Sequence, residues 1–194
     1  AVTWGAPDLR RAIAAKYQRH YGMAVNPDTE VTVCCGSTET MLATLMATVN
    51  PGDEVVIVAP YYENYWPDAV LAGATPRFVT LREPAFGQDA EGDAWHLDLD
   101  ELAVAFNERT AAIVLNTPGN PTGKVFTAEE LGVIADLCDR AVVMYAGEVV
   151  ERGELGPIFV KPLHPYTKGL LSSIPGADGT KAHRLTVIPG SVPD

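Results

Sequence analysis

The chain has 194 residues, of which 47% are hydrophobic, enough for the buried core of one ordinary domain, with or without an appendage. Its 25 acidic residues against 14 basic ones give a formal net charge of −11, which argues against a surface for nucleic acid or an anionic membrane. Every apolar run is shorter than the roughly 20 residues of a membrane span, so we expect no direct membrane insertion. The chain begins with Ala1 rather than Met, and we expect a fragment.

The three cysteines, Cys34, Cys35 and Cys138, form no disulfide framework, and none has the spacing of a metal site. We therefore expect buried thiols, no bound metal and a reducing cytoplasmic location.

Apolar periodicity predicts alternating helices and strands over the first part of the chain. The expected helices span residues 7–21, 36–49, 62–72, 98–106 and 128–140. The expected strands span residues 30–35, 54–58, 75–81 and 110–116, and residues 82–95 form a polar loop. Thr127 and Glu130 have the T-x-x-E spacing of a capping box. This order predicts an α/β domain with a mainly parallel sheet and flanking helices.

After Arg140 the pattern changes. Residues 141–153 predict two short strands with a turn at Ala146-Gly147, and residues 154–175 predict two short helices punctuated by prolines. The remaining residues read as loop, so the tail is a small, Pro-rich α+β segment.

Two turns of the first part have residues that suit a ligand. Gly36, Ser37 and Thr38 follow a predicted strand and open a helix, where free backbone N–H groups favour a phosphate. The alternative is an ordinary helix cap. In "APYYENYWP" (59–67) aromatic side chains follow another strand, where one ring could stack on a flat cofactor or simply pack in the core.

The stretch "LNTPGNPTGKVF" (115–126) is the most specific feature of the sequence. Asn116 and Asn120 follow a buried strand, within a loop that prolines restrain. Their amides could donate to an oxygen of a bound ring, and the alternative is a turn rich in Asn and Pro for conformational reasons alone.

Together these motifs give residues 1–139 a close resemblance to the class I/II aminotransferases, the fold-type I pyridoxal-phosphate enzymes that include kynurenine and aspartate-like transaminases. The segments that carry it are "WGAPDLRRAIAAKY", "GSTETMLA", "NPGDEVVIVAPYYENY", "GATPRFV" and "NTPGNPTGKVF". The implied fold is part of the large domain of such an enzyme. The implied activity is amino-group transfer between an amino acid and a 2-oxo acid, and a homodimer is a possible assembly.

The resemblance also implies site residues. Gly36, Ser37 and Thr38 would meet the phosphate of pyridoxal 5′-phosphate, and Tyr62 would stack on its ring. Asn120 would hydrogen-bond the phenolic oxygen of the ring, with Asn116 beside it.

The residues that do the chemistry in this family are missing. An acid for the pyridinium nitrogen and the Schiff-base lysine should follow the Asn loop, and neither context occurs. Lys181 lies near the family's spacing, but its surroundings, "DGTKAHRL", do not match. We therefore expect no catalytic residues and an inactive chain.

Residues 134–194 instead resemble the C-terminal end of the ATP-binding subunits of oligopeptide/dipeptide ABC transporters, most clearly in "HPYTKGLL". No G-x-x-x-x-G-K-[ST] phosphate loop occurs. We interpret the chain as a chimera, with a partial aminotransferase domain over 1–139 and a transporter-like tail over 140–194. A transporter ATPase fragment or a non-functional product are the alternative interpretations.

Overall fold

The computed structural model describes residues 3–83, 95–145 and 148–172. They form two compact units, which we call the sheet unit (residues 41–138) and the hairpin unit (residues 3–40 with 139–172). The relative positions of the chain's parts are not determined, so each unit is described by itself. Most of the predicted polar loop, the turn at Ala146-Gly147 and Lys181 lie outside the described residues.

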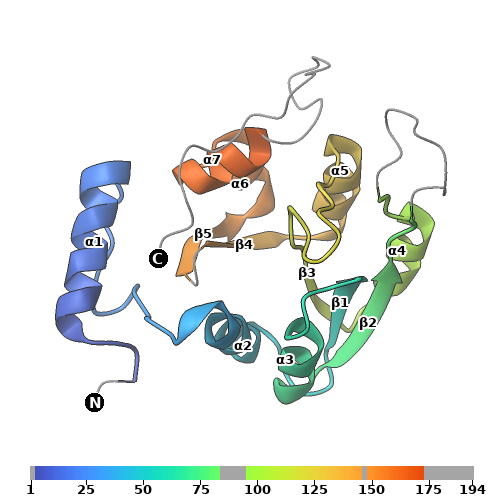
Figure 1. The fold of residues 1–194 in the computed structure, drawn as a ribbon, viewed down its shortest axis with the longest axis horizontal. Coiled ribbons are helices and arrows are strands. Elements are labelled where there is room, and N and C mark those ends of the chain that lie inside the picture. Colours follow the sequence, from blue (N-terminus) through green and yellow to red (C-terminus); the bar gives the residue numbers. More distant parts are fainter. Residues whose placement is uncertain (1–2, 84–94, 146–147, 173–194) are drawn as a thin grey trace. The chain divides into compact units, whose positions relative to one another are not determined.

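The sheet unit contains a three-stranded parallel sheet in the order β2-β1-β3 (Figure 1). Its strands are β1 (Glu54–Ala59), β2 (Thr75–Thr80) and β3 (Thr110–Val114). Its helices are α3 (Tyr65–Leu71), α4 (Leu99–Ala105) and α5 (Ala128–Leu137), together with the later residues of α2 (Gly36–Thr48). The predicted parallel sheet with flanking helices is thereby confirmed.

The central strand β1 is buried on both faces, and this explains its continuous run of Val and Ile. Successive side chains point to opposite faces, so Val56 and Val58 join one apolar cluster while Val55 and Ile57 join another. The first cluster also contains Val79, Leu81, Leu97, Leu102, Phe126, Leu131 and Ile134. The second also contains Leu45, Val49, Ala69 and Ala74. Apolar clusters therefore cover both faces of the sheet, which is the middle layer of this unit.

Two helices of this unit begin where the sequence signals predict. Thr127 Oγ1 accepts the Glu130 N–H at 3.1 Å, and the Glu130 carboxylate accepts the Thr127 N–H at 2.7 Å. The predicted capping box is thus confirmed. At the start of α4, Asp98 Oδ1 accepts the N–H groups of Asp100 and Glu101.

The hairpin unit contains an antiparallel pair, β4 (Arg140–Tyr145) and β5 (Glu148–Glu154), followed by α6 (Leu155–Val160) and α7 (Pro165–Ser172). The two predicted short strands and two short helices are confirmed. The buried carboxylate of Glu151 accepts the N–H groups of Leu163 at 2.8 Å and His164 at 3.2 Å, and so ties β5 to the turn before α7.

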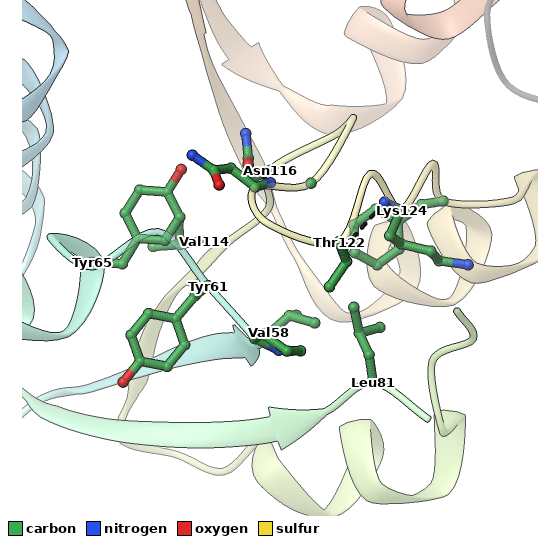
Figure 2. Close-up of a pocket in the computed structure, with 12 residues that line it drawn as sticks. Val58, Tyr61, Tyr65, Leu81, Val114, Asn116, Thr122 and Lys124 are labelled. Atoms are coloured by element: carbon green, nitrogen blue, oxygen red, sulfur yellow. Dashed lines mark hydrogen bonds between the residues drawn. The ribbon is translucent and has the colours of Figure 1, made fainter. Parts of the chain in front are cut away.

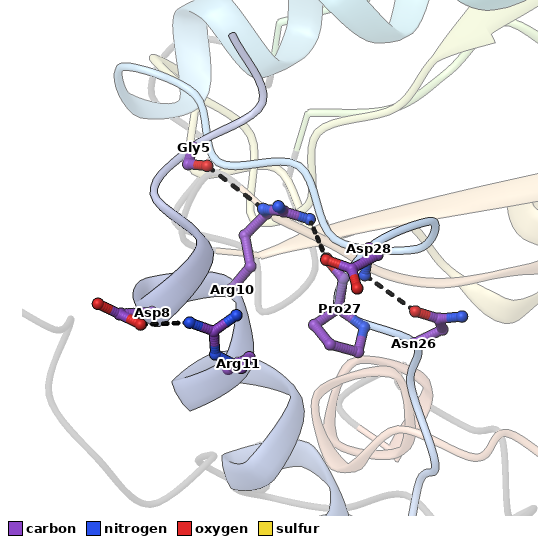
Figure 3. Close-up of polar contacts among 7 residues, drawn as sticks. All are labelled: Gly5, Asp8, Arg10, Arg11, Asn26, Pro27 and Asp28. Atoms are coloured by element: carbon purple, nitrogen blue, oxygen red, sulfur yellow. Dashed lines mark hydrogen bonds and ion pairs between the residues drawn. The ribbon is translucent and has the colours of Figure 1, made fainter. Parts of the chain in front are cut away.

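The same unit includes α1 (Pro7–Tyr21), which a buried arginine connects to the segment that follows it (Figure 3). Arg10 donates from Nε to the Gly5 carbonyl at 3.3 Å and from Nη1 to the Pro27 carbonyl, and Nη1 lies 3.3 Å from Asp28 Oδ1. Arg10 is 4% exposed, whereas its neighbour Arg11 pairs with Asp8 at the surface. One guanidinium therefore joins the segment before α1 to the segment at Pro27 and Asp28.

Two expectations, one for residues 30–35 and one for the three cysteines, are wrong. Residues 30–35 form no strand, since Val33 donates a single hydrogen bond to the Trp4 carbonyl and the described residues include no neighbouring strand that would pair with this segment. The thiols are not buried as a group either, because Cys35 is exposed and Cys34 and Cys138 are partly exposed.

Candidate functional site

A pocket in the sheet unit lies beyond the carboxyl ends of β1 and β3, the edge at which parallel sheets commonly bind ligands (Figure 2). It is lined by Val58, Pro60, Tyr61, Tyr65, Leu81, Val114, Asn116, Gly119, Asn120, Thr122, Lys124 and Phe126. Apolar side chains form its floor, and the Asn loop supplies most of its polar groups.

The Asn loop, residues 116–124, is closed by its own hydrogen bonds. The Asn120 N–H donates to Asn116 Oδ1 at 2.6 Å, and the Gly119 N–H donates to the Lys124 carbonyl at 2.8 Å. Gly123 has a φ of +69°, a conformation that favours glycine, and its N–H donates to the Gly119 carbonyl at 2.6 Å. The structure thus brings the two predicted asparagines together at one pocket.

The side-chain amide of Asn120 is available for a ligand. It is exposed at the pocket, and among the residues that the structure describes it has no hydrogen-bond partner. The side-chain oxygen of Asn116, Oδ1, in contrast, accepts the hydrogen bond of the Asn120 backbone N–H. The pocket lining therefore includes two side-chain amides, and an amide N–H is the kind of donor that a ring oxygen would require.

The aromatic side of the pocket includes two tyrosines that the sequence analysis does not select. Tyr62 does not line the pocket, but its ring stands edge-on to Tyr65 with centroids 5.9 Å apart. Tyr65 and Tyr61 do line it, and Tyr61 stacks on Phe78 at 5.5 Å. Burial, and secondarily the neighbouring Tyr62, raises the pKa of Tyr65. Sequence reasoning chose one aromatic of "PYYENY" and missed the other two, although all three follow the same strand.

The predicted phosphate turn lies at the start of α2. Gly36, Ser37 and Thr38 are exposed there, and Gly36 has a φ of +82°. The first turn also holds Glu39, whose carboxylate accepts the Cys35 N–H and raises the pKa of the Cys35 thiol. Because these residues belong to the hairpin unit, the structure does not place this turn relative to the pocket.

The residues present fit one part of pyridoxal 5′-phosphate. The exposed amide of Asn120 suits the phenolic oxygen, and the aromatic side chains beside it suit an apolar ring face. The enclosed space is about 20 Å³, which is room for roughly one water molecule. This space does not enclose a pyridine ring, so Asn120 and the aromatic side chains around it are the residues that would hold one.

Comparison with known proteins identifies the family. Residues 2–159 match the model of aminotransferase class I and II, so the chain belongs to that family. It is 43% identical over 136 residues to kynurenine–oxoglutarate transaminase 3 of Bos taurus, covering 70% of this chain and 30% of the relative. The kynurenine–oxoglutarate transaminase of Dictyostelium discoideum is 38% identical, with 94% of this chain and 39% of the relative covered.

A solved structure agrees with these relatives. N-succinyldiaminopimelate aminotransferase from Mycobacterium tuberculosis matches with a TM-score of 0.56 and 40% identity, over 71% of this chain and 34% of that one. The chain thus spans between 30% and 39% of the length of these three proteins. The likeness to fold-type I aminotransferases confirms the predicted fold class.

The tail has a second match. Residues 150–194 match the model of the oligopeptide/dipeptide transporter C-terminal region, as the resemblance of "HPYTKGLL" predicts. The two matched ranges overlap at residues 150–159, so aminotransferase likeness reaches past residue 139. The division into domains at residue 139 stays a prediction.

Neither a membrane-crossing helix nor a metal-binding cluster occurs in the part of the chain that the structure describes. Within residues 3–83, 95–145 and 148–172, no helix is long and apolar enough to cross a membrane. The same ranges contain no cluster of three or more His, Cys, Asp or Glu side chains that could hold a metal ion.

Proposed function

We propose that the sheet unit carries part of the cofactor site of a pyridoxal-phosphate-dependent aminotransferase, and that the chain by itself does not catalyse amino-group transfer. The observation that carries the first part is the Asn loop, which holds Asn120 with its side-chain amide exposed at a pocket beyond β1 and β3. The family match over residues 2–159 supports the nature of the ligand.

Each residue has a distinct role in this proposal. Asn120 donates a hydrogen bond to the ring's phenolic oxygen, and Asn116 holds the Asn120 backbone in place. Tyr62, which stands edge-on to Tyr65 beside the pocket, would stack on the ring of the cofactor. Gly36, Ser37 and Thr38 belong to the hairpin unit, and by the family resemblance alone they would supply backbone and hydroxyl donors for a phosphate.

The bound cofactor would supply an electron sink for the amino-group transfer, and the protein must supply a lysine and an acid on the ring nitrogen. After the Asn loop the sequence continues into the Pro-rich tail, with no acid-bearing strand or lysine turn of the family's kind. For this reason we propose that the chain binds the cofactor but does not catalyse amino-group transfer. By the same proposal the ligands of such a site would be an amino acid and a 2-oxo acid, a homodimer is the proposed assembly, and the cytoplasm is the proposed location of the chain.

Titration with pyridoxal 5′-phosphate tests the proposal. The wild-type chain should change the absorbance of the cofactor with saturation, and Asn120→Ala should weaken this binding. Asn26→Ala is a matched control, because Asn26 caps a turn in the hairpin unit and does not line the pocket. Equal binding by all three chains, or by none, would refute the cofactor role of Asn120.

A second assay tests the proposed lack of turnover. Borohydride treatment of the complex should give no stoichiometric adduct on any one lysine, and incubation with an amino acid and a 2-oxo acid should give no product. A stoichiometric adduct mapped to a single lysine by mass spectrometry would contradict this part of the proposal.

The match of residues 150–194 favours one alternative, a fragment of a transporter ATPase. The sequence has no G-x-x-x-x-G-K-[ST] loop to hold the phosphates of ATP, so this proposal requires a nucleotide site of another kind. ATP binding at micromolar concentration, measured by calorimetry, would favour it over the aminotransferase proposal, and we expect none. A non-functional chimeric product would bind neither ligand.

A further inference from the structure

A buried lysine forms the end of the Asn loop. The Lys124 side chain is 3% exposed, and its Nζ lies 2.8 Å from the carboxylate of Glu130, whose side chain is 7% exposed. Figure 2 shows the Lys124 side chain leaving the loop in a direction away from Asn116. Lysine is rarely buried unless it is paired, so this ammonium has an anchoring partner and does not point at a ligand.

The carboxylate that receives Lys124 joins three segments of the sheet unit. Besides Lys124, Glu130 accepts the Leu97 N–H at 2.9 Å and the Thr127 N–H at 2.7 Å. Burial by itself raises the pKa of Glu130, but Lys124 and the two backbone donors outweigh it and leave the pKa below its ordinary value. The carboxylate is therefore ionised at neutral pH, and the ammonium is held at a fixed point.

The position of Lys124 determines the position of the loop. The Lys124 carbonyl accepts the Gly119 N–H at 2.8 Å, and the Lys124 N–H donates to Thr122 Oγ1 at 3.2 Å. Gly119 directly precedes Asn120, whose own N–H is held by Asn116. A chain of short contacts thus runs from the Glu130 carboxylate through Lys124 to the backbone of Asn120.

We propose that Lys124 is a positioning residue: paired with Glu130, it holds the Asn loop so that the Asn120 amide faces the ligand at the pocket. The ligand part of this inference rests on the proposed function, whereas the anchoring of the loop does not. Neither the family match nor the sequence pattern assigns this role to Lys124.

Amide hydrogen exchange, followed by NMR on the whole chain, tests the anchoring without any ligand. Lys124→Met should speed exchange at Gly119, Asn120 and Gly123 by about tenfold or more, with a smaller change in β1, because the opening is local. Lys161→Met, which removes an exposed lysine, is the matched control. Unchanged exchange in the loop, or equal acceleration in β1, would overturn the inference.

If Lys124→Met does not fold, Glu130→Gln serves as the second variant. Its amide oxygen can still accept a backbone N–H, while the charge that holds Lys124 is removed. The same selective acceleration in the loop is expected, and its absence would overturn the inference.

A double-mutant cycle with pyridoxal 5′-phosphate tests the link to Asn120. Lys124→Met should weaken binding roughly tenfold in the wild-type background, an effect common for residues that support a binding site, and should have no further effect on Asn120→Ala. Additive losses would show that Lys124 does not act through Asn120. If the wild-type chain binds no cofactor, the proposed function fails, and the exchange experiment still decides the anchoring.

Discussion

Asn116 and Asn120 are joined by a hydrogen bond of 2.6 Å, from the backbone N–H of Asn120 to the side-chain Oδ1 of Asn116. The first asparagine therefore has a conformational role, while the amide of the second is left exposed at the pocket. Of the two explanations that the sequence allows, a turn rich in Asn or a ligand site, the hydrogen bond supports the first for Asn116, and a ligand role for Asn120 stays a proposal.

This relationship predicts different effects of substitution at Asn116. Asn116→Ala should speed amide exchange at Asn120 and cost about 1 kcal/mol of stability, the net contribution of an ordinary hydrogen bond. Asn116→Asp keeps the acceptor oxygen and should leave exchange at Asn120 close to the wild-type rate. Similar exchange in Asn116→Ala and wild type would show that the bond does not hold the loop.

A second prediction concerns the carboxylate of Glu54, which is 2% exposed at the start of β1. Hydrogen bonds from Arg77 and Asn107, with the charge of Arg109 nearby, lower the pKa of Glu54 from 4.5 to about 2. A carboxyl with a depressed pKa in the folded state stabilises the fold above its unfolded pKa. Stability should therefore be lost as pH falls from about 4.5 to about 2.

Urea unfolding at a series of pH values measures this effect. The urea midpoint of the wild-type chain should fall as the pH is lowered from about 4.5 to about 2, the window set by the unfolded and folded pKa of Glu54. Glu54→Gln should be less stable at pH 7 and should lose less on acidification. An identical pH dependence in the two chains would show that Glu54 does not contribute.

Helix α4 contains one buried and one exposed apolar residue, and comparing substitutions at the two tests the contribution of the apolar core. Leu102 is fully buried against the sheet, while Val104 on the same helix is 85% exposed. Leu102→Ala should cost about 2–5 kcal/mol of unfolding free energy, and Val104→Ala within about 0.5 kcal/mol. Equal losses in urea unfolding would mean that α4 does not pack on the sheet in this way.

The start of α5 and the position of β1 could be predicted from the sequence, because local signals define both. The α5 capping box follows from the spacing of Thr127 and Glu130, and β1 follows from its unbroken Val and Ile run between turn residues. These signals lie within a few residues of the elements that they define. They are independent of where the rest of the chain packs.

What the sequence could not predict depends on tertiary neighbours. The segment 30–35 has the composition of a strand, but a strand needs a partner, and none is present among the described residues. The place of Tyr65 at the pocket and the burial of Lys124 depend on how α3 and the Asn loop meet the end of the sheet. A motif selects candidate residues, but packing decides which of them face a ligand.

In the hairpin unit, a buried arginine, Arg10, can be compared with its exposed neighbour, Arg11. Arg10→Met removes a buried guanidinium from two backbone carbonyls and should cost about 2–3 kcal/mol. Arg11→Met removes only a surface pair with Asp8 and should cost no more than about 1 kcal/mol. Thermal unfolding followed by circular dichroism compares them, and a loss at Arg11 as large as at Arg10 would contradict the structure.

The proposal that the Asn loop is part of a cofactor site is tested most directly by NMR. The chain is labelled with ¹⁵N at asparagine and titrated with pyridoxal 5′-phosphate. The side-chain amide signal of Asn120 should shift with saturation, together with that of Asn116, while that of the matched control Asn26 should not move. Saturable binding that leaves the Asn120 amide unchanged would contradict the claim that this loop is part of a cofactor site.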